Sequence, residues 1–289
     1  MLARTGRCGD KARTLSDGLP QASRDHPVST SSHPRAQHAA AEPRLKLHLG
    51  VEPVKRQAAG SRRRDEKDDI EMPEVIFPGP DGRIEGRYHP AKEKGSPVAL
   101  LLHPHPQLGG TMNNQIVYKL YYTFANRGFA VLRFNFRGVG RSQGSFDYGQ
   151  GELSDAAAAL DWLQSNNVDS RKCWIAGVSF GCWIGMQLLM RRPEIDGFIS
   201  IAPMANRFDF SFLAPCPSSG LFVHGDEDRV APVAEVMPII EKVKTQKGIK
   251  IEHAIVGGAN HFFENRVDEL IETVERYLDR RLGVSSAAA

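Results

Sequence analysis

The chain has 289 residues, of which 41% are hydrophobic and 25% are charged, the usual proportions for a globular protein. No apolar run reaches the roughly 18 residues that a membrane-spanning helix requires, so no membrane span is expected. The net charge of +3 is unevenly distributed: residues 1–70 carry 14 Lys and Arg against 9 Asp and Glu, or +5, and residues 71–289 carry 23 against 25, or −2. Because the basic excess lies outside the predicted folded body, no nucleic-acid partner is expected.

Residues 1–70 are rich in Arg, Ser, Ala, Pro and His and have no sustained strand or helix period. Such a segment buries too little apolar surface to offset the entropy lost on folding, which predicts a disordered basic extension. An alternative is that Met72 begins the natural protein. The segment has the Arg and Ser content of a transit peptide, but its scattered acidic residues argue against one. One folded domain is expected at residues 71–283, followed by a loose tail at 284–289.

The predicted folded part alternates short apolar runs with segments of helical period. A β-hairpin is predicted from residues 74–77 and 83–89, joined by a loop of five residues, Pro78-Gly79-Pro80-Asp81-Gly82. Further strands are expected at residues 97–102, 129–136, 173–176, 197–202, 220–223 and 249–256. Helices are expected at residues 113–126, 152–163, 184–190, 233–244 and 268–282.

This alternation predicts an α/β fold with a doubly wound, mostly parallel sheet, helices on both faces and an antiparallel N-terminal edge. The short connection between Ala202 and Gly220 leaves no room for a large cap domain. Ligands bind such sheets outside the carboxyl ends of the strands. The polar and glycine-rich clusters of this sequence follow the predicted strands, so we expect them to meet at one edge.

The segment Gly177-Val178-Ser179-Phe180-Gly181 lies between a predicted strand and a predicted helix and fits the pattern G-x-S-x-G. In a nucleophile elbow of this pattern, a strained turn holds the serine hydroxyl clear of the sheet. Glycine is needed on both sides because the backbone passes very close to its neighbours. The alternative is an ordinary serine in a glycine-rich turn. Ser179 is therefore the candidate nucleophile, provided that an acid and a base follow.

Three histidines follow Ser179, namely His224, His253 and His261. On this architecture the chain order is serine, then acid, then histidine. His224 precedes the expected acid, and His253 lies inside a predicted strand. His261 lies in a loop just after the last predicted strand and follows two glycines, which predicts that it is the base. The alternative is an exposed loop histidine without a chemical role.

Several acidic residues lie between Ser179 and His261. Asp228 follows the strand 220–223 and precedes a predicted helix, so it is the predicted acid that orients the histidine. Asp226 is better placed to bind the backbone of the turn, Glu227 is expected to point the other way, and Asp209 follows an earlier strand.

An oxyanion hole requires two N–H donors. One is expected from the backbone of Phe180, the residue after the serine, and the other from the loop after residues 97–102. Proline has no N–H, which excludes Pro104 and Pro106 and leaves His105, with Gln107 as the second choice.

No metal or cofactor is expected. His103 and His105 form an H-x-H pattern without partnering carboxylates, and neither a G-x-G-x-x-G after a strand nor a P-loop lysine occurs. The four cysteines form no C-x-x-C pair, which is typical of a reducing compartment and predicts a cytoplasmic protein.

Five segments arrive in a familiar order: HPHP-x-x-GG at residues 103–110, NFRGVGRSQG at 135–144, GVSFG at 177–181, HGDEDRVAP at 224–232 and GANHFF at 258–263. With them the chain resembles an α/β-hydrolase serine enzyme, and is most similar to small bacterial dienelactone-hydrolase-like and serine-aminopeptidase-like members. His103-Pro104 replaces the H-G that usually opens the first segment in that family.

The resemblance implies a serine hydrolase that cleaves an ester or thioester of a small molecule through an acyl-enzyme. The alternatives are an amide or peptide-bond hydrolase of the same fold, and a non-catalytic binding protein that has kept the fold. Phe208, Phe210 and Phe212 lie in the short connection after residue 202. They are predicted to form the aromatic rim of an open site for an acyl or alcohol group of modest size.

Overall fold

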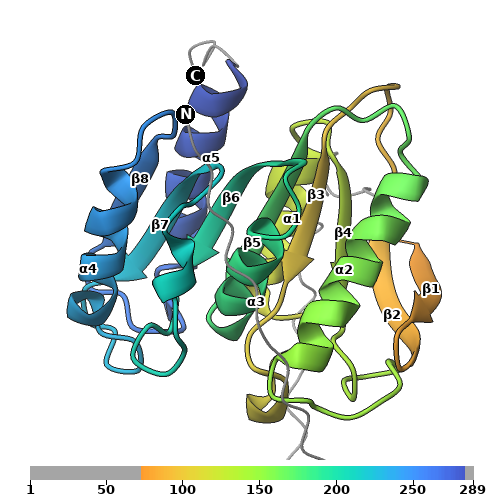
Figure 1. Cartoon of the computed structure of the whole chain (residues 1–289), viewed down its shortest axis with the longest axis horizontal. Helices are drawn as coiled ribbons and strands as arrows, with labels where there is room; N and C mark the ends of the chain where they lie inside the picture. The colour runs from red at the N-terminus through yellow and green to blue at the C-terminus, as the bar shows by residue number, and fades with distance from the viewer. Residues whose placement is uncertain (1–72, 284–289) are drawn as a thin grey trace, which may run out of the picture. The chain divides into compact units, whose positions relative to one another are not determined.

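The computed structural model describes residues 73–283, so the predicted basic extension at 1–70 and the predicted tail at 284–289 lie outside the described residues. The described strands form one eight-stranded sheet in the order β1-β2-β4-β3-β5-β6-β7-β8 (Figure 1). The strands are β1 (Glu74–Gly79), β2 (Gly82–His89), β3 (Val98–Leu102), β4 (Ala130–Phe134), β5 (Cys173–Val178), β6 (Ile195–Ile201), β7 (Ser219–Gly225) and β8 (Ile251–Val256).

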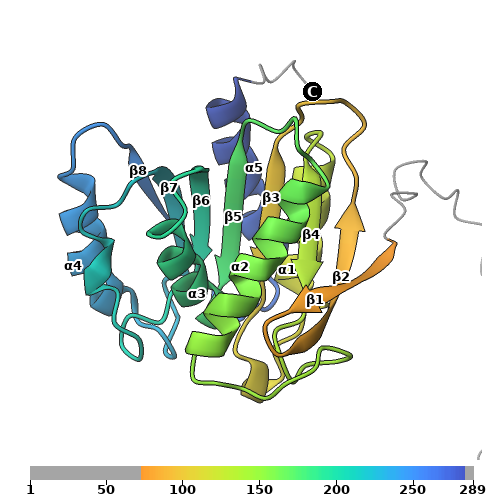
Figure 2. The ribbon, with the colours of Figure 1, turned by 45° about the vertical axis from the view of Figure 1, so that its right-hand side comes forward.

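The sheet is antiparallel at its N-terminal edge and parallel elsewhere. β1 pairs with β2, and β2 with β4, in the antiparallel sense (Figure 2). The neighbouring pairs from β4 through β8 are all parallel. Every residue of β3 and β4 is buried, as expected for strands that are covered on both faces. This arrangement confirms the predicted doubly wound sheet.

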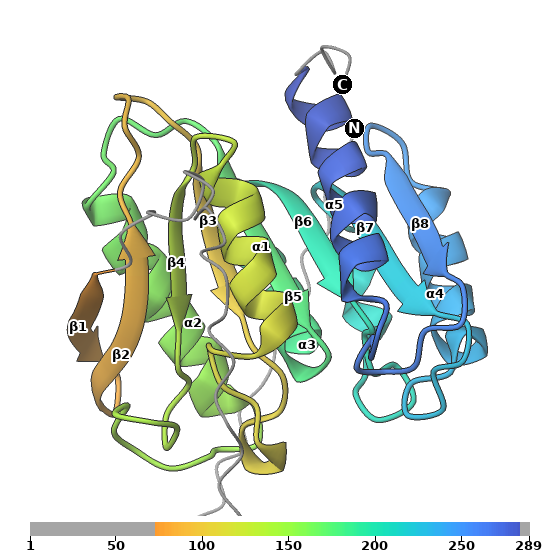
Figure 3. The same cartoon turned by 180° about the vertical axis from the view of Figure 1, so that it is seen from behind.

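Helices cover both faces of the sheet. The helices are α1 (Gln115–Ala125), α2 (Gln150–Ser165), α3 (Phe180–Leu189), α4 (Val233–Lys244) and α5 (Val267–Leu282), with single 3-10 turns at η1 (Pro106–Leu108) and η2 (Ser211–Leu213). α2, α3 and α4 lie on the face toward the viewer in Figure 1, and α1 and α5 on the face toward the viewer in Figure 3. Each layer encloses its own cluster of buried apolar side chains.

Two further features of residues 73–283 bear on function. The connection from β6 to β7 contains only η2, so no cap domain is inserted there, as predicted. None of the helices in this range combines the length and the apolar character needed to cross a bilayer.

The N-terminal hairpin is tighter than predicted. Its strands pair as far as Gly79 and Gly82, which leaves only Pro80 and Asp81 in a turn predicted to have five residues. The strand β1 continues through Pro78 because β1 is the edge of the sheet, where a missing N–H costs no ladder hydrogen bond. Gly82 has a φ of 109°, which glycine adopts without strain.

The helix after the predicted elbow begins earlier than expected. It was predicted at residues 184–190, but α3 begins at Phe180, and only Ser179 separates it from β5. The two glycines on either side of Ser179, Gly177 in β5 and Gly181 in α3, are required by close packing. A Cβ at Gly181 would collide with the carbonyl oxygen of Leu102, and one at Gly177 with that of Gly181. Tertiary contact therefore overrides local propensity here.

A buried ion pair holds the loop after β4 to α2. Arg137 donates through Nε to Asp155 Oδ2 at 3.0 Å and through Nη2 to Oδ1 at 2.8 Å. The backbone N–H of Arg137 also donates to Asp155 Oδ2, at 3.0 Å. Both residues are buried, so the fork geometry satisfies charges that would otherwise be costly to bury.

Two histidines near the carboxyl ends of strands are fully buried. His103 follows β3 directly, and His224 is the penultimate residue of β7. Burial lowers the pKa of each imidazole to about 4, because the charged ring would lose its hydration. Both rings are therefore neutral at neutral pH.

We predict that the free energy of unfolding falls as the pH is lowered from about 6.5, the pKa of an unfolded histidine, to about 4. In this window the unfolded state binds protons that the native rings of His103 and His224 do not, which favours unfolding. Each buried ring contributes up to about 3 kcal/mol. Guanidinium denaturation at neutral pH and near pH 5 measures the decline. His224→Leu should show a smaller decline than the wild type, and an equal decline in both proteins would contradict the assignment.

Candidate active site

Ser179 lies at the carboxyl end of β5, in a strained turn. Its φ of 56° and ψ of −113° lie outside the regions that a residue with a side chain normally adopts. The backbone N–H of Ser179 donates to Ile201 O, at the end of β6, at 2.8 Å. The turn is thus fixed by the neighbouring strand, and Ser179 is buried, with 5% of the residue exposed.

Three side chains from separate loops form a continuous hydrogen-bonded chain. Ser179 Oγ lies 3.0 Å from His261 Nε2, and His261 Nδ1 lies 2.7 Å from Asp228 Oδ2. A carboxylate only accepts hydrogen bonds, so Nδ1 of His261 carries the proton and donates it to Asp228. Nε2 is then left to accept the hydroxyl proton of Ser179. The arrangement can transfer a proton from the hydroxyl to the imidazole.

Asp228 is held as a carboxylate. Its Oδ1 accepts hydrogen bonds from the backbone N–H groups of Val230 at 2.9 Å and Ala231 at 2.7 Å. Burial raises the pKa of Asp228, but the hydrogen bonds from His261 and from these N–H groups outweigh it and leave the pKa below its usual value. The side chain, which is fully buried, therefore offers a negative charge to His261.

The other acidic residues considered from the sequence have different partners. Asp226 Oδ1 accepts from the backbone N–H of Gly258 at 2.6 Å and ties the loop after β7 to the loop after β8. Asp209 is exposed and accepts hydrogen bonds from the N–H and hydroxyl of Ser211, at 2.7 Å and 2.9 Å. Glu227 is exposed. Of the acids considered, Asp228 is the one hydrogen-bonded to His261.

The other two histidines after Ser179 contact each other. The ring centroids of His224 and His253 lie 5.4 Å apart in an edge-on arrangement. Burial lowers the pKa of both imidazoles. Across residues 73–283, no group of three or more His, Cys, Asp or Glu side chains is arranged to hold a metal ion.

The loop after β3 brings His105 beside Phe180. The ring centroids of the two residues are 4.9 Å apart. Gln107 N–H donates to His105 Nδ1 at 3.2 Å, so this second candidate donor is already engaged. Within the described part of the chain, the backbone N–H groups of His105 and Phe180 donate to no protein acceptor. These two N–H groups are therefore available to an anion.

Aromatic rings surround Phe180 at this end of the sheet. Its centroid lies 5.6 Å from that of Phe208 and 6.0 Å from those of Trp183 and Phe146. Phe208 and Trp183 stack at 4.6 Å, and Trp183 Nε1 donates to Asp209 O at 3.0 Å. Tyr148, 82% exposed, lies beyond Phe146.

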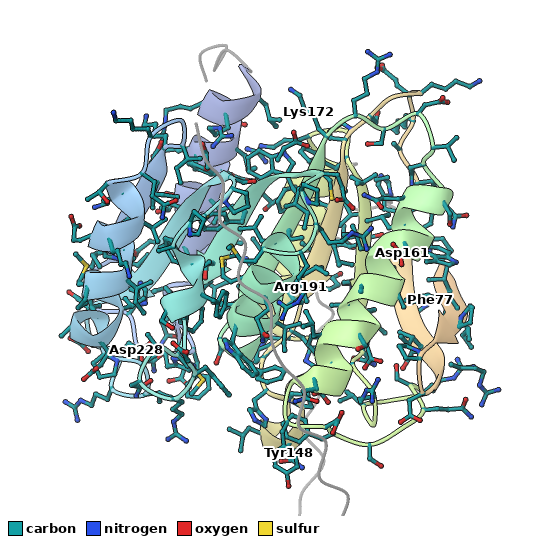
Figure 4. The ribbon with its side chains drawn as sticks, viewed as in Figure 1. Phe77, Tyr148, Asp161, Lys172, Arg191 and Asp228 are labelled. Atoms are coloured by element: carbon teal, nitrogen blue, oxygen red, sulfur yellow. The ribbon has the colours of Figure 1, made fainter. Side chains whose placement is uncertain are left out.

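Figure 4 shows Tyr148 and Asp228 at the same end of the molecule, toward which the parallel strands of Figure 1 point.

The three phenylalanines predicted to form an aromatic rim differ in burial. Phe208 is half-buried and packs beside Phe180, but Phe210 is only 2% exposed and lies in the core, so Phe210 cannot belong to an exposed rim. Phe212 is half-buried and stacks on Phe210 at 6.1 Å. Sequence reasoning missed Phe146 and Trp183. Their signals are present: Trp183 lies one helical turn after Ser179, and Phe146 follows the glycine-rich loop after β4.

Comparisons with known proteins found one matching family model and several relatives in sequence. The family model for X-Pro dipeptidyl-peptidase (S15 family) matches residues 83–218. A protein of Rickettsia prowazekii (strain Madrid E), RP471, is 49% identical over 211 residues, which cover 72% of this chain and 89% of that protein. Lysophosphatidylserine lipase ABHD12 of Rattus norvegicus is 27% identical over 179 residues. That match spans 54% of this chain but only 44% of the lipase.

Two solved structures are similar over nearly their whole length. ATU1826 of Agrobacterium tumefaciens, described as a candidate alpha/beta hydrolase, has a TM-score of 0.72 and 68% identity, covering 74% of this chain and 98% of that chain. An alpha-beta serine hydrolase homologue from Coxiella burnetii has a TM-score of 0.65 and 36% identity, covering 71% of this chain and 97% of that chain. With this likeness in sequence and fold, the chain belongs to the α/β-hydrolase superfamily, among its serine hydrolases.

Proposed function

We propose that the protein hydrolyses an ester or thioester of a small molecule through an acyl-enzyme, with Ser179 as nucleophile, His261 as base and Asp228 as the acid that orients it. The hydrogen-bonded chain through these three side chains, at 3.0 Å and 2.7 Å, is the observation that supports the proposal most strongly. A serine hydroxyl becomes a nucleophile only when an oriented base takes its proton.

In the proposed reaction, His261 Nε2 takes the hydroxyl proton while Ser179 Oγ forms a bond to the acyl carbon. The carbonyl oxygen becomes an oxyanion that accepts hydrogen bonds from the N–H groups of Phe180 and His105. The imidazolium, stabilised by Asp228, then gives its proton to the leaving alcohol or thiol as the acyl bond breaks. Water repeats the sequence on the acyl-enzyme, releasing the acid and restoring Ser179.

Cleavage of an amide or peptide bond is the second candidate. The match of residues 83–218 to the X-Pro dipeptidyl-peptidase family favours it. The likeness to ABHD12, which is named as a lipase, favours an ester. The half-buried rings of Phe208, Trp183 and Phe146 also suit an apolar acyl or alcohol group more than a charged peptide terminus.

We also propose the cytoplasm as the location of the protein. In the described residues Cys173, Cys182 and Cys216 are buried and unpaired, as is usual in a reducing compartment. Burial raises the pKa of Cys173 and Cys182 to about 12, which keeps both thiols protonated and unreactive.

Ser179→Ala is expected to abolish labelling by a fluorophosphonate probe and to lower kcat for p-nitrophenyl esters by at least ~10⁴-fold. The reason is that, among residues 73–283, Ser179 supplies the hydroxyl that is hydrogen-bonded to His261. Ser170→Ala, which changes a half-exposed serine before β5, serves as the matched control and should label and turn over as the wild type does. Undiminished turnover by Ser179→Ala would refute the proposed nucleophile.

Asp228→Asn is expected to lower kcat about 10⁴-fold, because an amide no longer holds the His261 tautomer that accepts the serine proton. Asp226→Asn, two residues earlier, keeps an oxygen that can accept from Gly258 and should retain the wild-type kcat. Steady-state kinetics of both variants on one ester separate the two acids. If the two substitutions had equal effects, the proposed role of Asp228 would be wrong.

Phe208→Ala is expected to raise KM for apolar p-nitrophenyl esters about 5–30-fold, the effect of losing one ring from an apolar contact. Phe210→Ala should instead leave KM unchanged and lower the free energy of unfolding by about 3–5 kcal/mol, since its ring is buried in the core. The measurement is KM over a series of acyl-chain lengths, with aminoacyl p-nitroanilides alongside. Faster turnover of the anilides than of every ester would favour the amide alternative.

A further inference from the structure

His103 makes two hydrogen bonds that the proposed reaction does not use. The ring, fully buried after β3, has Nδ1 2.6 Å from the carbonyl oxygen of Pro104 and Nε2 3.1 Å from the backbone N of Phe136. It also packs edge-on against the ring of Phe136, with centroids 4.7 Å apart. His103 therefore joins the loop that carries His105 to the end of β4.

The partners of His103 define its tautomer. The carbonyl of Pro104 can only accept, so Nδ1 carries the proton, and the N–H of Phe136 can only donate, so Nε2 is bare. A second proton on Nε2 would face the N–H of Phe136 and break that bond. Burial, which lowers the pKa of His103 to about 4, agrees with this neutral form.

The bond to Pro104 also determines the direction of the next N–H group. The only cis peptide in residues 73–283 is Ala214–Pro215, so the peptide between Pro104 and His105 is trans. In a trans peptide the carbonyl and the N–H point in opposite directions. A carbonyl that is directed at the His103 ring therefore directs the His105 N–H away from that ring.

The sheet order shows which side that is. β3 lies between β4 and β5. His103 reaches toward β4 through Phe136, so the His105 N–H is directed toward the β5 side, where Ser179 and Phe180 lie. The contact between the rings of His105 and Phe180 agrees with this placement.

Few other torsions could turn this peptide. The ring of Pro104 fixes its own φ, and Pro106 restricts His105 to extended backbone, observed at φ −54° and ψ 122°. The carbonyl of His105 accepts from the N–H groups of Leu108 at 3.1 Å and Gly110 at 3.0 Å. The ψ of Pro104 is the main remaining freedom, and the hydrogen bond from His103 restrains it.

We propose that His103 is a positioning residue of the oxyanion hole, and that its neutral imidazole locks the Pro104–His105 peptide with the His105 N–H facing the nucleophile before a substrate binds. This inference rests on the proposed function. The His105 N–H would contact the oxyanion that develops during the reaction. Loss of the hydrogen bond from His103 to Pro104 should therefore destabilise the transition state more than the bound substrate.

The test compares His103→Leu with His103→Asn. Leucine fills much of the space but cannot donate, and should lower kcat for a p-nitrophenyl ester about 10²–10³-fold, the effect of losing one oxyanion donor, with little change in KM. Asparagine places an amide N–H at the same number of bonds from the backbone as Nδ1, so it should restore most of that kcat. A kcat of His103→Leu equal to that of the wild type would overturn the proposal. A kcat of His103→Asn no higher than that of His103→Leu would also overturn it.

Two controls distinguish an effect of poorer folding from an effect of losing the hydrogen bond between His103 and Pro104. Leu278→Ala creates a cavity in the core beside α5, distant in sequence from the loop, and should destabilise the protein while keeping kcat per folded molecule. If His103→Leu does not fold, His103→Met, whose side chain also cannot donate, takes its place, and a kcat of His103→Met equal to that of Leu278→Ala per folded molecule would overturn the proposal. A kcat of folded His103→Asn as low as that of Ser179→Ala would overturn it. Fluorophosphonate labelling of the wild type tests the proposed function separately, since it does not depend on His103.

Discussion

The close packing of the Ser179 turn between the ends of β3 and β6 is the constraint on which the rest of the site depends. The N–H of Ser179 is tied to Ile201, and the backbone at Gly181 lies against the carbonyl of Leu102. No side chain fits at either glycine of this turn. The positive φ of Ser179 persists because strands on both sides of β5 enforce it.

Hydrogen bonds outside the Ser179–His261–Asp228 chain fix the loops that meet at this turn. Asp226 ties the loop after β7 to the loop after β8, which keeps Asp228 and His261 within hydrogen-bond distance. On the other side, Asn135 Oδ1 accepts from the N–H of Met112 at 2.8 Å and anchors the far end of the loop after β3 to the end of β4. The geometry is thus built before any ligand arrives, which is what electrostatic stabilisation of a transition state requires.

Much of the fold could be predicted from the sequence because burial on both faces of a parallel sheet leaves continuous apolar runs, as in β3 and β4. Chain order and the ends of strands also led to the prediction of Ser179, Asp228 and His261, whose side chains are hydrogen-bonded in a chain in the structure. The boundaries of helices and strands were harder to predict from the sequence. The start of α3 at Phe180 depends on glycine contacts with β3, and the tight hairpin depends on β1 being an edge strand. Neither contact is local in sequence.

Side-chain burial was the least predictable feature. Phe208 and Phe210 are two residues apart in one short segment, yet Phe208 contacts Trp183 and Phe180 whereas Phe210 is buried in the core. The role proposed for His103 depends on a hydrogen bond to the end of β4, a strand some thirty residues away, and on sheet order. Motif spacing carries no information about either.

The covalent intermediate gives the most direct test of the account. The wild type is mixed with a p-nitrophenyl ester, quenched with acid during turnover and digested, and the peptides are weighed by mass spectrometry. The account predicts that the peptide containing Ser179 gains the mass of the acyl group and that hydroxylamine removes it. Burst release of p-nitrophenol with the acyl group on another residue, or turnover without any acylated peptide, would contradict it.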